Sequence, residues 1–409
     1  MARDQDLFAY IGCWDMYKSG TGNGFGVCRY DPDTAELQLL HSALPQITVG
    51  AATLAASGDV LYCTDERATL PGYFRGGGGL IYAIEIDKRS GRLREINHQP
   101  SFGSLPSHLS LDATGEYLVV THHTGREPVT KVCGSAAGEY RISLEYDDAT
   151  TVLFPIRADG SIAAPADVHR HSGGGGPLPR QTHPQLHSVA VSPCGSLFAV
   201  CDKGNDEIVI FRIDRRTSRL EVCGGGVFKS IPGSSPRYSA FHPTHPYLFV
   251  NHETRAIVSS LRYGRDGSLE LLCTASSLPD DREDNFEMKQ SDLAVHPSGK
   301  FLYSLIRGIN AVCVFKVREE NGRIERTQTA VIEGTGPRGC AISPDGRFLL
   351  IAALTSNEVL TWSIGSDGSL EPTGNALRIA NPGSITFGRR GYPQSSRTQP
   401  PAPRAYIQP

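Results

Sequence analysis

One phrase recurs along the chain and constrains its fold more than any other feature. It consists of an apolar strand, a turn of the Pro/Asp-Gly type, a second apolar strand and a short polar corner before a third strand. Clear copies begin at Thr53, His108, His187, Tyr238, Ser291 and Gly339. The steps between them are roughly 50 residues, apart from a longer one between His108 and His187. A period of this length predicts a repeat architecture.

Within each copy, apolar residues alternate with polar ones or form short runs, and Val, Ile, Leu, Phe and Tyr dominate. This pattern favours half-buried β-strands over helices. Each unit is predicted to be a four-stranded antiparallel meander, which cannot bury both of its faces alone. Radial stacking of such units buries both faces, so the sequence predicts an all-β chain folded as a β-propeller.

The number of innermost strands predicts seven blades. Six come from the copies above, and the segment 381–387, NPGSITF, has the pattern of a seventh with no further strand behind it. The N-terminal segments LFAYIGCWD, GFGVCRYD and AELQLLHS can supply the three missing strands. We therefore expect the N- and C-terminal strands to pair within one blade and to close the ring, because closure removes exposed sheet edges.

The repeats also bear on domain organisation. A length of 409 residues would by itself suggest two or three domains, but the repeats favour one large domain over residues 1–388. Two segments, 126–147 and 163–182, interrupt the repeat and are predicted to be insertions in loops at one end of the propeller, where they can cover a central pocket. The Pro- and Ser-rich tail, residues 389–409, is expected to be disordered.

Composition narrows the classes of partner. The net charge is -3 and Lys and Arg are scattered, so no basic face for nucleic acid is predicted. No apolar run reaches the ~18 residues of a membrane span, and the start MARDQDLF lacks the pattern of a secretory signal. Cysteines sit singly inside predicted strands without a CxxC pair, which suits a reducing compartment. We expect a cytoplasmic protein that is a monomer or a small homo-oligomer.

Several catalytic motifs are missing from the sequence. Two Gly-rich segments, 75–80 and 172–177, lack the ending of a phosphate-binding loop, and no GxSxG elbow occurs. The segment HPQLH places His183 and His187 four residues apart, but no third ligand follows, so neither a metal site nor any other cofactor is expected.

Polar residues at equivalent places in successive blades are the candidates for a functional site. In a propeller, the segments that enter the innermost strands surround the axis, so residues far apart in sequence meet in one pocket. The starts of these strands contribute His108, His187, Arg237, Asp292 and Arg338, and the ends of the next strands contribute His122, His123, Glu253 and Arg307. Two arginines, a glutamate and a histidine at one end would suit the binding of a small anionic molecule.

Four stretches carry a resemblance to a known family. They contain LHSV with His187, SPRY with Arg237, NHET with Glu253 and LIRG with Arg307. The chain, from Tyr10 to the segment 381–387, resembles the lactonase family of seven-bladed propellers, which includes bacterial 6-phosphogluconolactonases and fungal 3-carboxy-cis,cis-muconate lactonising enzymes. The resemblance implies that these four residues are catalytic.

The chain departs from the family pattern near these motifs. Gln185, Tyr238 and His252 stand where the bacterial pattern has histidine, histidine and asparagine. Together with Asp292, Arg338, His108 and His122, these three residues are expected to contact the substrate.

The resemblance implies a hydrolase that opens a small anionic or polyhydroxylated lactone, such as a sugar-acid lactone, with activated water. The same residues suit a cycloisomerase that forms a lactone from a carboxymuconate-type diacid. A non-catalytic binding propeller is a further alternative, although the repeated Gly-His and Trp-Asp signature of WD40 proteins is missing. The sequence leaves open whether His187 or Glu253 acts as the base.

Overall fold

Each copy of the repeated phrase folds into the two inner strands of a sheet in the computed structural model, which describes residues 7–14, 23–125, 127–134, 138–285 and 287–388. In the copy at His187, β14 (Leu186–Val191) pairs antiparallel with β15 (Phe198–Asp202), and Val189 lies opposite Val200. The turn between them contains Gly195 with a φ of 71°, a left-handed conformation that glycine adopts without steric cost.

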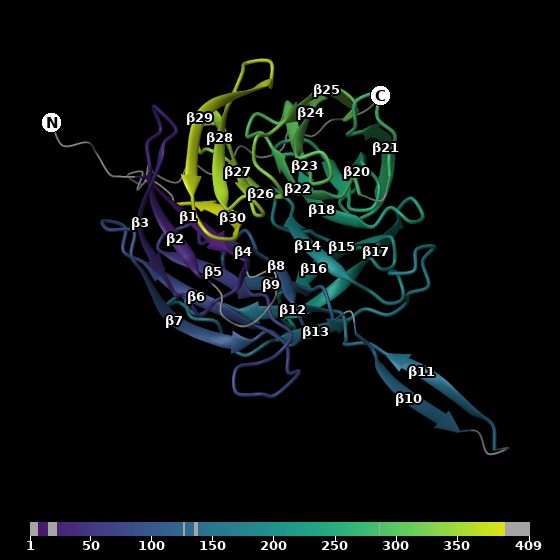
Figure 1. Ribbon diagram of the computed structural model, residues 1–409. Helices are drawn as coiled ribbons and strands as arrows, with labels where there is room; N and C mark the ends of the chain where they lie inside the picture. The colour runs from purple at the N-terminus through teal and green to yellow at the C-terminus, as the bar shows by residue number, and fades with distance from the viewer. Residues whose placement is uncertain (1–6, 15–22, 126, 135–137, 286, 389–409) are drawn as a thin grey trace.

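Seven four-stranded antiparallel sheets surround one axis, as the sequence predicted (Figure 1). In each sheet the first strand lies nearest the axis and the fourth lies at the rim. Three sheets precede residue 230: β4 (Val49–Leu54), β5 (Val60–Asp65), β6 (Leu80–Ile86) and β7 (Leu93–Pro100); β8 (Pro106–Leu111), β9 (Tyr117–His122), β12 (Thr150–Pro155) and β13 (Asp167–Arg170); β14, β15, β16 (Glu207–Asp214) and β17 (Arg219–Lys229).

Three further sheets follow along the chain, and the seventh combines both chain ends. They are β18 (Pro236–Phe241), β19 (Tyr247–His252), β20 (Ile257–Tyr263) and β21 (Leu269–Ser276); β22 (Gln290–Val295), β23 (Phe301–Ile306), β24 (Ala311–Val317) and β25 (Ile324–Val331); β26 (Pro337–Ile342), β27 (Phe348–Ala353), β28 (Glu358–Ile364) and β29 (Leu370–Arg378); β30 (Pro382–Phe387), β1 (Leu7–Cys13), β2 (Phe25–Tyr30) and β3 (Leu37–Ala43).

The seventh sheet closes the ring in the predicted register. Ile11 of β1 lies opposite Ile385 of β30. Side chains of β1 alternate between two interfaces, because successive residues of a strand point to opposite faces. Ile11 packs with the sheet of β26 to β29, whereas Tyr10 packs with the sheet of β4 to β7. Both faces of the closing sheet are therefore buried.

Every innermost strand has an irregularity in its pairing at its first residues. A bulge re-aims the side chain of the extra residue, and bulges are common beside active sites. We call the end of the ring where these strands begin the top face and the other end the bottom face. The bulges place the second residue of each innermost strand at the top of the axis.

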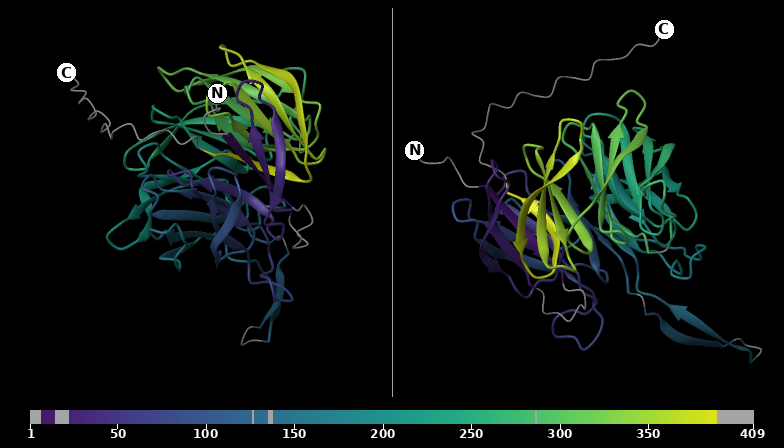
Figure 2. Two further views of the ribbon diagram at one scale, coloured as in Figure 1. Left: turned by 90° about the vertical axis from the view of Figure 1, so that its left-hand side faces the viewer. Right: turned by 45° about the horizontal axis from the view of Figure 1, so that its top comes forward.

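The two segments that interrupt the repeat differ from each other. Within 126–147, β10 (Val129–Gly134) and β11 (Tyr140–Glu145) form a separate two-stranded hairpin that projects away from the ring (Figures 1 and 2). Within 163–182, β13 is the rim strand of its sheet, so this segment contributes to the blade as well as to the loop behind it.

Among the described residues, no helix is long and apolar enough to cross a membrane. The tail expected to be disordered, residues 389–409, lies outside the described residues.

Candidate active site

Two sets of seven equivalent positions surround the top of the axis. The first set, the bulge positions, is the second residue of each innermost strand: Gly50, Ser107, His187, Arg237, Ser291, Arg338 and Gly383. The second set, the corner positions, follows the second strand of each sheet. Its members each donate a backbone N–H to the carbonyl of the residue just before the innermost strand: Trp14, Glu66, His123, Lys203, Glu253, Arg307 and Leu354.

Glu253 lies at the centre of the polar residues in these sets. Its carboxylate forms ion pairs with the Lys203 ammonium, with Arg237 Nε at 3.2 Å and with Arg307 Nη2 at 3.4 Å. Burial alone would raise the pKa of Glu253, but the three cations outweigh it and hold the pKa well below its usual range. Glu253 therefore stays ionised, and one carboxylate holds three cations together. We call these four residues and His187 the axial cluster.

Lys203 connects the cluster to the neighbouring blade. Its Nζ lies 3.0 Å from His123 Nε2. Burial lowers the pKa of the Lys203 ammonium to about 8, with Glu253 opposing the shift and Arg237 adding to it. Lys203 thus loses its charge in mildly alkaline solution, unlike an exposed lysine.

His187 supplies a neutral imidazole beside these cations. Burial, followed by the charges of Arg237 and Lys203, holds the pKa of His187 well below its usual range. Its ring lies 5.1 Å from the Tyr238 ring and 5.8 Å from the His123 ring. Its Nδ1 is buried and has no hydrogen-bond partner among the described residues. An unprotonated imidazole with an unused nitrogen is suited to accept a proton.

The two arginines of the cluster differ in exposure and in their contacts. Arg237 donates to Glu253 and to the Ser291 carbonyl, and only 4% of its side chain is exposed. Arg307 donates to the Gln290 carbonyl at 3.3 Å, and 31% of its side chain is exposed. Arg307 Nε meets no partner among the described residues. Arg237 is therefore fixed, whereas Arg307 can take up a contact from solvent.

A second group, the Trp14 group, lies on the far side of the axis. Arg338 stacks on the Trp14 ring at 3.8 Å, and both donate to Glu66 Oε2, Arg338 at 3.2 Å and Trp14 Nε1 at 2.7 Å. Glycine at two bulge positions makes room for it. A Cβ on Gly383 would approach Trp14 Cβ to 2.8 Å, and one on Gly50 would approach Glu66 Oε2 to 2.7 Å.

Three more of the predicted residues, Tyr238, His108 and Asp292, lie near the axial cluster. Tyr238 contacts the Arg237 guanidinium at 5.1 Å and the His108 ring at 5.4 Å. Asp292 accepts the backbone N–H groups of Leu293 and Cys340, each at 2.8 Å, and burial raises the pKa of its carboxyl.

The structure does not bring three of the predicted residues into the cluster. His122 and His252 are fully buried within their blades, where His122 contacts Thr150 and His252 contacts Ser259 at 2.8 Å. Both stand one position before a corner position and face away from the axis. Gln185 donates to the Arg180 carbonyl at 2.6 Å and does not reach the cluster.

Sequence reasoning missed Lys203, Glu66 and Trp14, which lie at the same places as His123, Glu253 and Arg307 in their blades. Aligning the blades on the last residue of the second strand would have found them.

The His183 and His187 pair does not converge on a metal. His183 stacks on the Tyr146 ring at 3.9 Å and its Nε2 contacts Thr124 Oγ1 at 2.8 Å. Across the described parts of the chain, no group of three His, Cys, Asp or Glu residues is placed to hold a metal ion.

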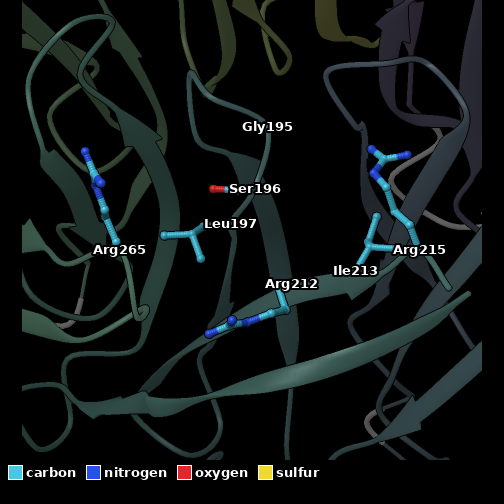
Figure 3. A pocket seen from close by; sticks show the side chains of 7 residues that line it. All are labelled: Gly195, Ser196, Leu197, Arg212, Ile213, Arg215 and Arg265. Carbon is cyan, nitrogen blue, oxygen red and sulfur yellow. The ribbon is translucent and has the colours of Figure 1, made fainter. Parts of the chain in front are cut away.

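An arginine-lined pocket lies on the bottom face, beside the β14–β15 turn (Figure 3). It has a volume of about 210 Å³ and is lined by Arg212, Arg215 and Arg265. Arg215 pairs with Asp112 and with Glu116 at 2.7 Å. The three guanidinium groups lie apart around Leu197 rather than meeting at one point (Figure 3).

Comparison with known proteins agrees with this architecture. Residues 8–387 match the family described as "Lactonase, 7-bladed beta-propeller". The chain belongs to this lactonase family. The expectation of a lactonase-type enzyme is thereby confirmed.

Several relatives of this chain are named 6-phosphogluconolactonase. The protein of Bacillus subtilis (strain 168) is 27% identical over 384 residues, which cover 92% of this chain and 98% of the relative. The protein of Formosa agariphila is 26% identical over 356 residues, with 86% and 91% covered. The periplasmic gluconolactonase PpgL of Pseudomonas aeruginosa shares the fold, with a TM-score of 0.81 and 24% identity over 94% of this chain and 99% of that chain.

Proposed function

We propose that this protein hydrolyses a small anionic or polyhydroxylated sugar-acid lactone with water activated by His187. The observation that carries the proposal is the axial cluster, in which Glu253 gathers three cations beside a neutral histidine with an unused nitrogen. The name of the Bacillus subtilis and Formosa agariphila relatives supports a lactone whose anionic group is a phosphate.

Arg307 and Lys203 are the groups we assign to the anionic substituent. Arg307 is the most exposed of the three cations on Glu253, so it can turn a donor toward the substrate without leaving the cluster. A guanidinium binds phosphate or carboxylate through two parallel hydrogen bonds. Lys203 adds a second positive charge within the same cluster.

His187, rather than Glu253, is the base in this proposal. A general base must be unprotonated in the resting enzyme and must have an atom free to accept the proton. Glu253 is ionised but binds three cations, so protonating it would break three favourable contacts. His187 is neutral and Nδ1 has no competing partner among the described residues.

The reaction then takes two steps. His187 accepts a proton from water as the water oxygen bonds to the lactone carbonyl carbon, and Arg237 stabilises the resulting oxyanion. The bond between this carbon and the ring oxygen then breaks, and His187 returns its proton to the ring oxygen, which becomes a hydroxyl group. The products are the free acid, which ionises, and the unprotonated histidine. Arg237 is suited to this role because its contacts with Glu253 and the Ser291 carbonyl hold its guanidinium in place.

The Trp14 group is the candidate site for the hydroxyl groups of the substrate. Glu66 can accept hydrogen bonds from hydroxyls, and Arg338 can donate to them. Trp14 presents an apolar ring surface of the kind that packs against sugar C–H groups. A substrate that spans the axis would contact both groups.

A substrate panel tests the proposal directly. Purified protein would be offered sugar-acid lactones with and without phosphate, together with muconate-type diacids. Acid release would be followed by pH-stat and diene loss by ultraviolet absorption. We expect hydrolysis of a sugar-acid lactone, fastest with the anionic ring. Diene loss without lactone hydrolysis would favour a cycloisomerase, and a folded protein silent on the whole panel would contradict the proposal.

Two variants separate the roles of the candidate bases. His187→Asn should abolish hydrolysis while the ring-opened acid still binds as in wild type, whereas Glu253→Gln should tighten binding of that acid, because three cations are released from their carboxylate. Equal loss of rate in both variants with unchanged binding would contradict the assignment. The expected cytoplasmic location stays a prediction, which cell fractionation would test.

A further inference from the structure

We propose that the β10–β11 hairpin is a dimerisation arm whose apolar face packs against the same face of a second copy of the chain. This inference stands apart from the proposed function. The hairpin leaves the top face between β9 and β12, and neither of its strands pairs with a blade strand among the described residues. It extends away from the ring in all the views (Figures 1 and 2).

The register of the hairpin separates two faces, because residues opposite one another in an antiparallel pair share a face. On one face, Val132 lies opposite Ile142, Thr130 opposite Leu144 and Gly134 opposite Tyr140. The other face carries Lys131 opposite Ser143, Cys133 opposite Arg141 and Val129 opposite Glu145, with an ion pair between Lys131 and Glu145. The hairpin is therefore amphipathic.

Nothing in the described part of the chain covers the apolar face. The exposed fractions of Val132, Tyr140, Ile142 and Leu144 are 71%, 79%, 72% and 54%. A two-stranded hairpin alone is marginally stable in water, and three or more strands or a packing partner are needed for independent stability. A face of this kind marks an interaction site.

A second exposed apolar segment adds to this surface. Tyr73 is 63% exposed and Phe74 is fully exposed, both in the top-face loop between β5 and β6. The next residue, Arg75, forms an ion pair with Glu127 near the start of the hairpin, which places the loop beside the base of the arm.

The area of this surface fits a dimer. Aromatic side chains carry about 150 to 250 Å² each, so Tyr73, Phe74 and Tyr140, with the aliphatic side chains added, approach the roughly 800 Å² per partner of a standard interface.

The charge of the arm favours a second copy over an anionic membrane. The formal charges of β10 and of residues 138–145 balance, because two basic residues, Lys131 and Arg141, are matched by two acidic ones, Glu139 and Glu145. Two arms can therefore approach without net repulsion, whereas an arm for an anionic membrane would carry an excess of basic residues. A two-fold axis pairs identical surfaces, which is the most common symmetry of soluble oligomers. Two such hairpins can stack about 10 Å apart with their side chains interdigitated.

Light scattering on the full chain, after size-exclusion chromatography across micromolar concentrations, tests the proposal. We expect wild type at twice the chain mass and the Ile142→Lys, Val132→Lys double variant at the chain mass. Because both side chains are exposed, the double variant should unfold at the same temperature as wild type. The matched control is Ser143→Lys, which adds a positive charge to the opposite face next to Ile142 and should stay dimeric.

Three results would overturn the proposal. They are a wild-type protein at the chain mass at every concentration, a dimer that survives the double variant, and a monomeric wild type that sediments with phosphatidylcholine vesicles only when Ile142 is intact. The last result would assign the apolar face to a lipid surface. A variant that replaces residues 129–145 by a short Gly-Ser linker gives a second check, since it should be monomeric and retain the thermal stability of the ring.

Discussion

Arginines gather at both ends of the propeller, but in different surroundings. At the top of the axis, Arg237 and Arg307 converge on the buried carboxylate of Glu253, beside a histidine nitrogen without a partner among the described residues. In the bottom-face pocket, Arg215 already pairs with two carboxylates, and Arg212 donates to the Asp266 carbonyl at 3.5 Å. The difference teaches that convergence and burial, rather than the number of cations or the volume of a pocket, identify a candidate site.

The largest difference between the two ends should appear in the free energy of unfolding when one carboxylate is removed at each end. Glu253→Gln leaves Lys203 and Arg237 buried without their anion, so we expect the free energy of unfolding to fall by about 3 to 5 kcal/mol. Urea unfolding followed by circular dichroism measures this loss. Glu116→Gln at the bottom pocket removes a carboxylate whose side chain is 66% exposed, so the change should stay within about 1 kcal/mol.

Unfolding measured in the presence of sulfate tests the same cluster in a second way. A divalent anion should bind the three cations left by Glu253→Gln and stabilise that variant more than wild type. Equal unfolding midpoints for wild type and Glu253→Gln would show that the cations do not depend on the carboxylate, and would remove the basis for the axial cluster.

The next largest difference should appear in kcat/KM when one arginine is removed at each end. Arg237→Ala should lower kcat/KM on the best lactone by about 10²- to 10³-fold, or about 2.7 to 4 kcal/mol, because one oxyanion contact is lost. Arg212→Ala in the bottom pocket should leave kcat/KM unchanged. Added guanidinium ion should partly restore Arg237→Ala, a rescue that a merely unfolded variant would not show. Equal activity in the two variants would break the distinction between the two ends.

The sequence predicted the ring well because the information for it is local. Alternating apolar residues and the repeated turns define each blade, and the pattern of NPGSITF at 381–387 placed the closing strand. His187, Arg237 and Arg338 were found because they share one bulge position, although the bulge itself has no sequence signal.

The two-residue period of a strand explains why some predicted site residues lie away from the axis. A shift of one residue moves a side chain to the opposite face. His122 and His252 are the last residues of their strands and face the blade interior, whereas the next residues, His123 and Glu253, face the axis. Lys203 lies outside the four motifs of the family resemblance, so only the corner position that every blade shares indicates it.

His252, which lies inside its blade, should affect stability rather than catalysis. Burial lowers the pKa of His252 to about 3, so the folded state prefers its neutral form. The stability it contributes is complete above the unfolded pKa of about 6.5 and is lost, by about 1.4 kcal/mol per pH unit, as the pH falls below that value. His252→Gln should therefore flatten the decline of the unfolding free energy in mildly acidic solution.

The smallest effect expected is a pH dependence of anion binding at the axial cluster. The pKa of Lys203 is about 8, so the ammonium is charged at neutral pH and loses its proton as the pH rises through that value. With one of the three cations on Glu253 lost, the ring-opened acid should bind less tightly, by up to about tenfold for 1.4 kcal/mol. Its inhibition constant avoids interference from spontaneous lactone hydrolysis, and the acid itself stays ionised over this range.

Two substitutions at Lys203 isolate the cause of this dependence. Lys203→Arg keeps a cation that does not titrate, so its inhibition constant should be flat where that of wild type rises. Lys203→Met lacks the charge throughout and should bind the acid weakly at every pH. If Lys203→Arg showed the same rise as wild type, another group would be titrating, and the part of Lys203 in anion binding would be wrong even with the rest of the cluster intact. No matching transition is expected at the bottom pocket, where the cations are arginines that stay charged.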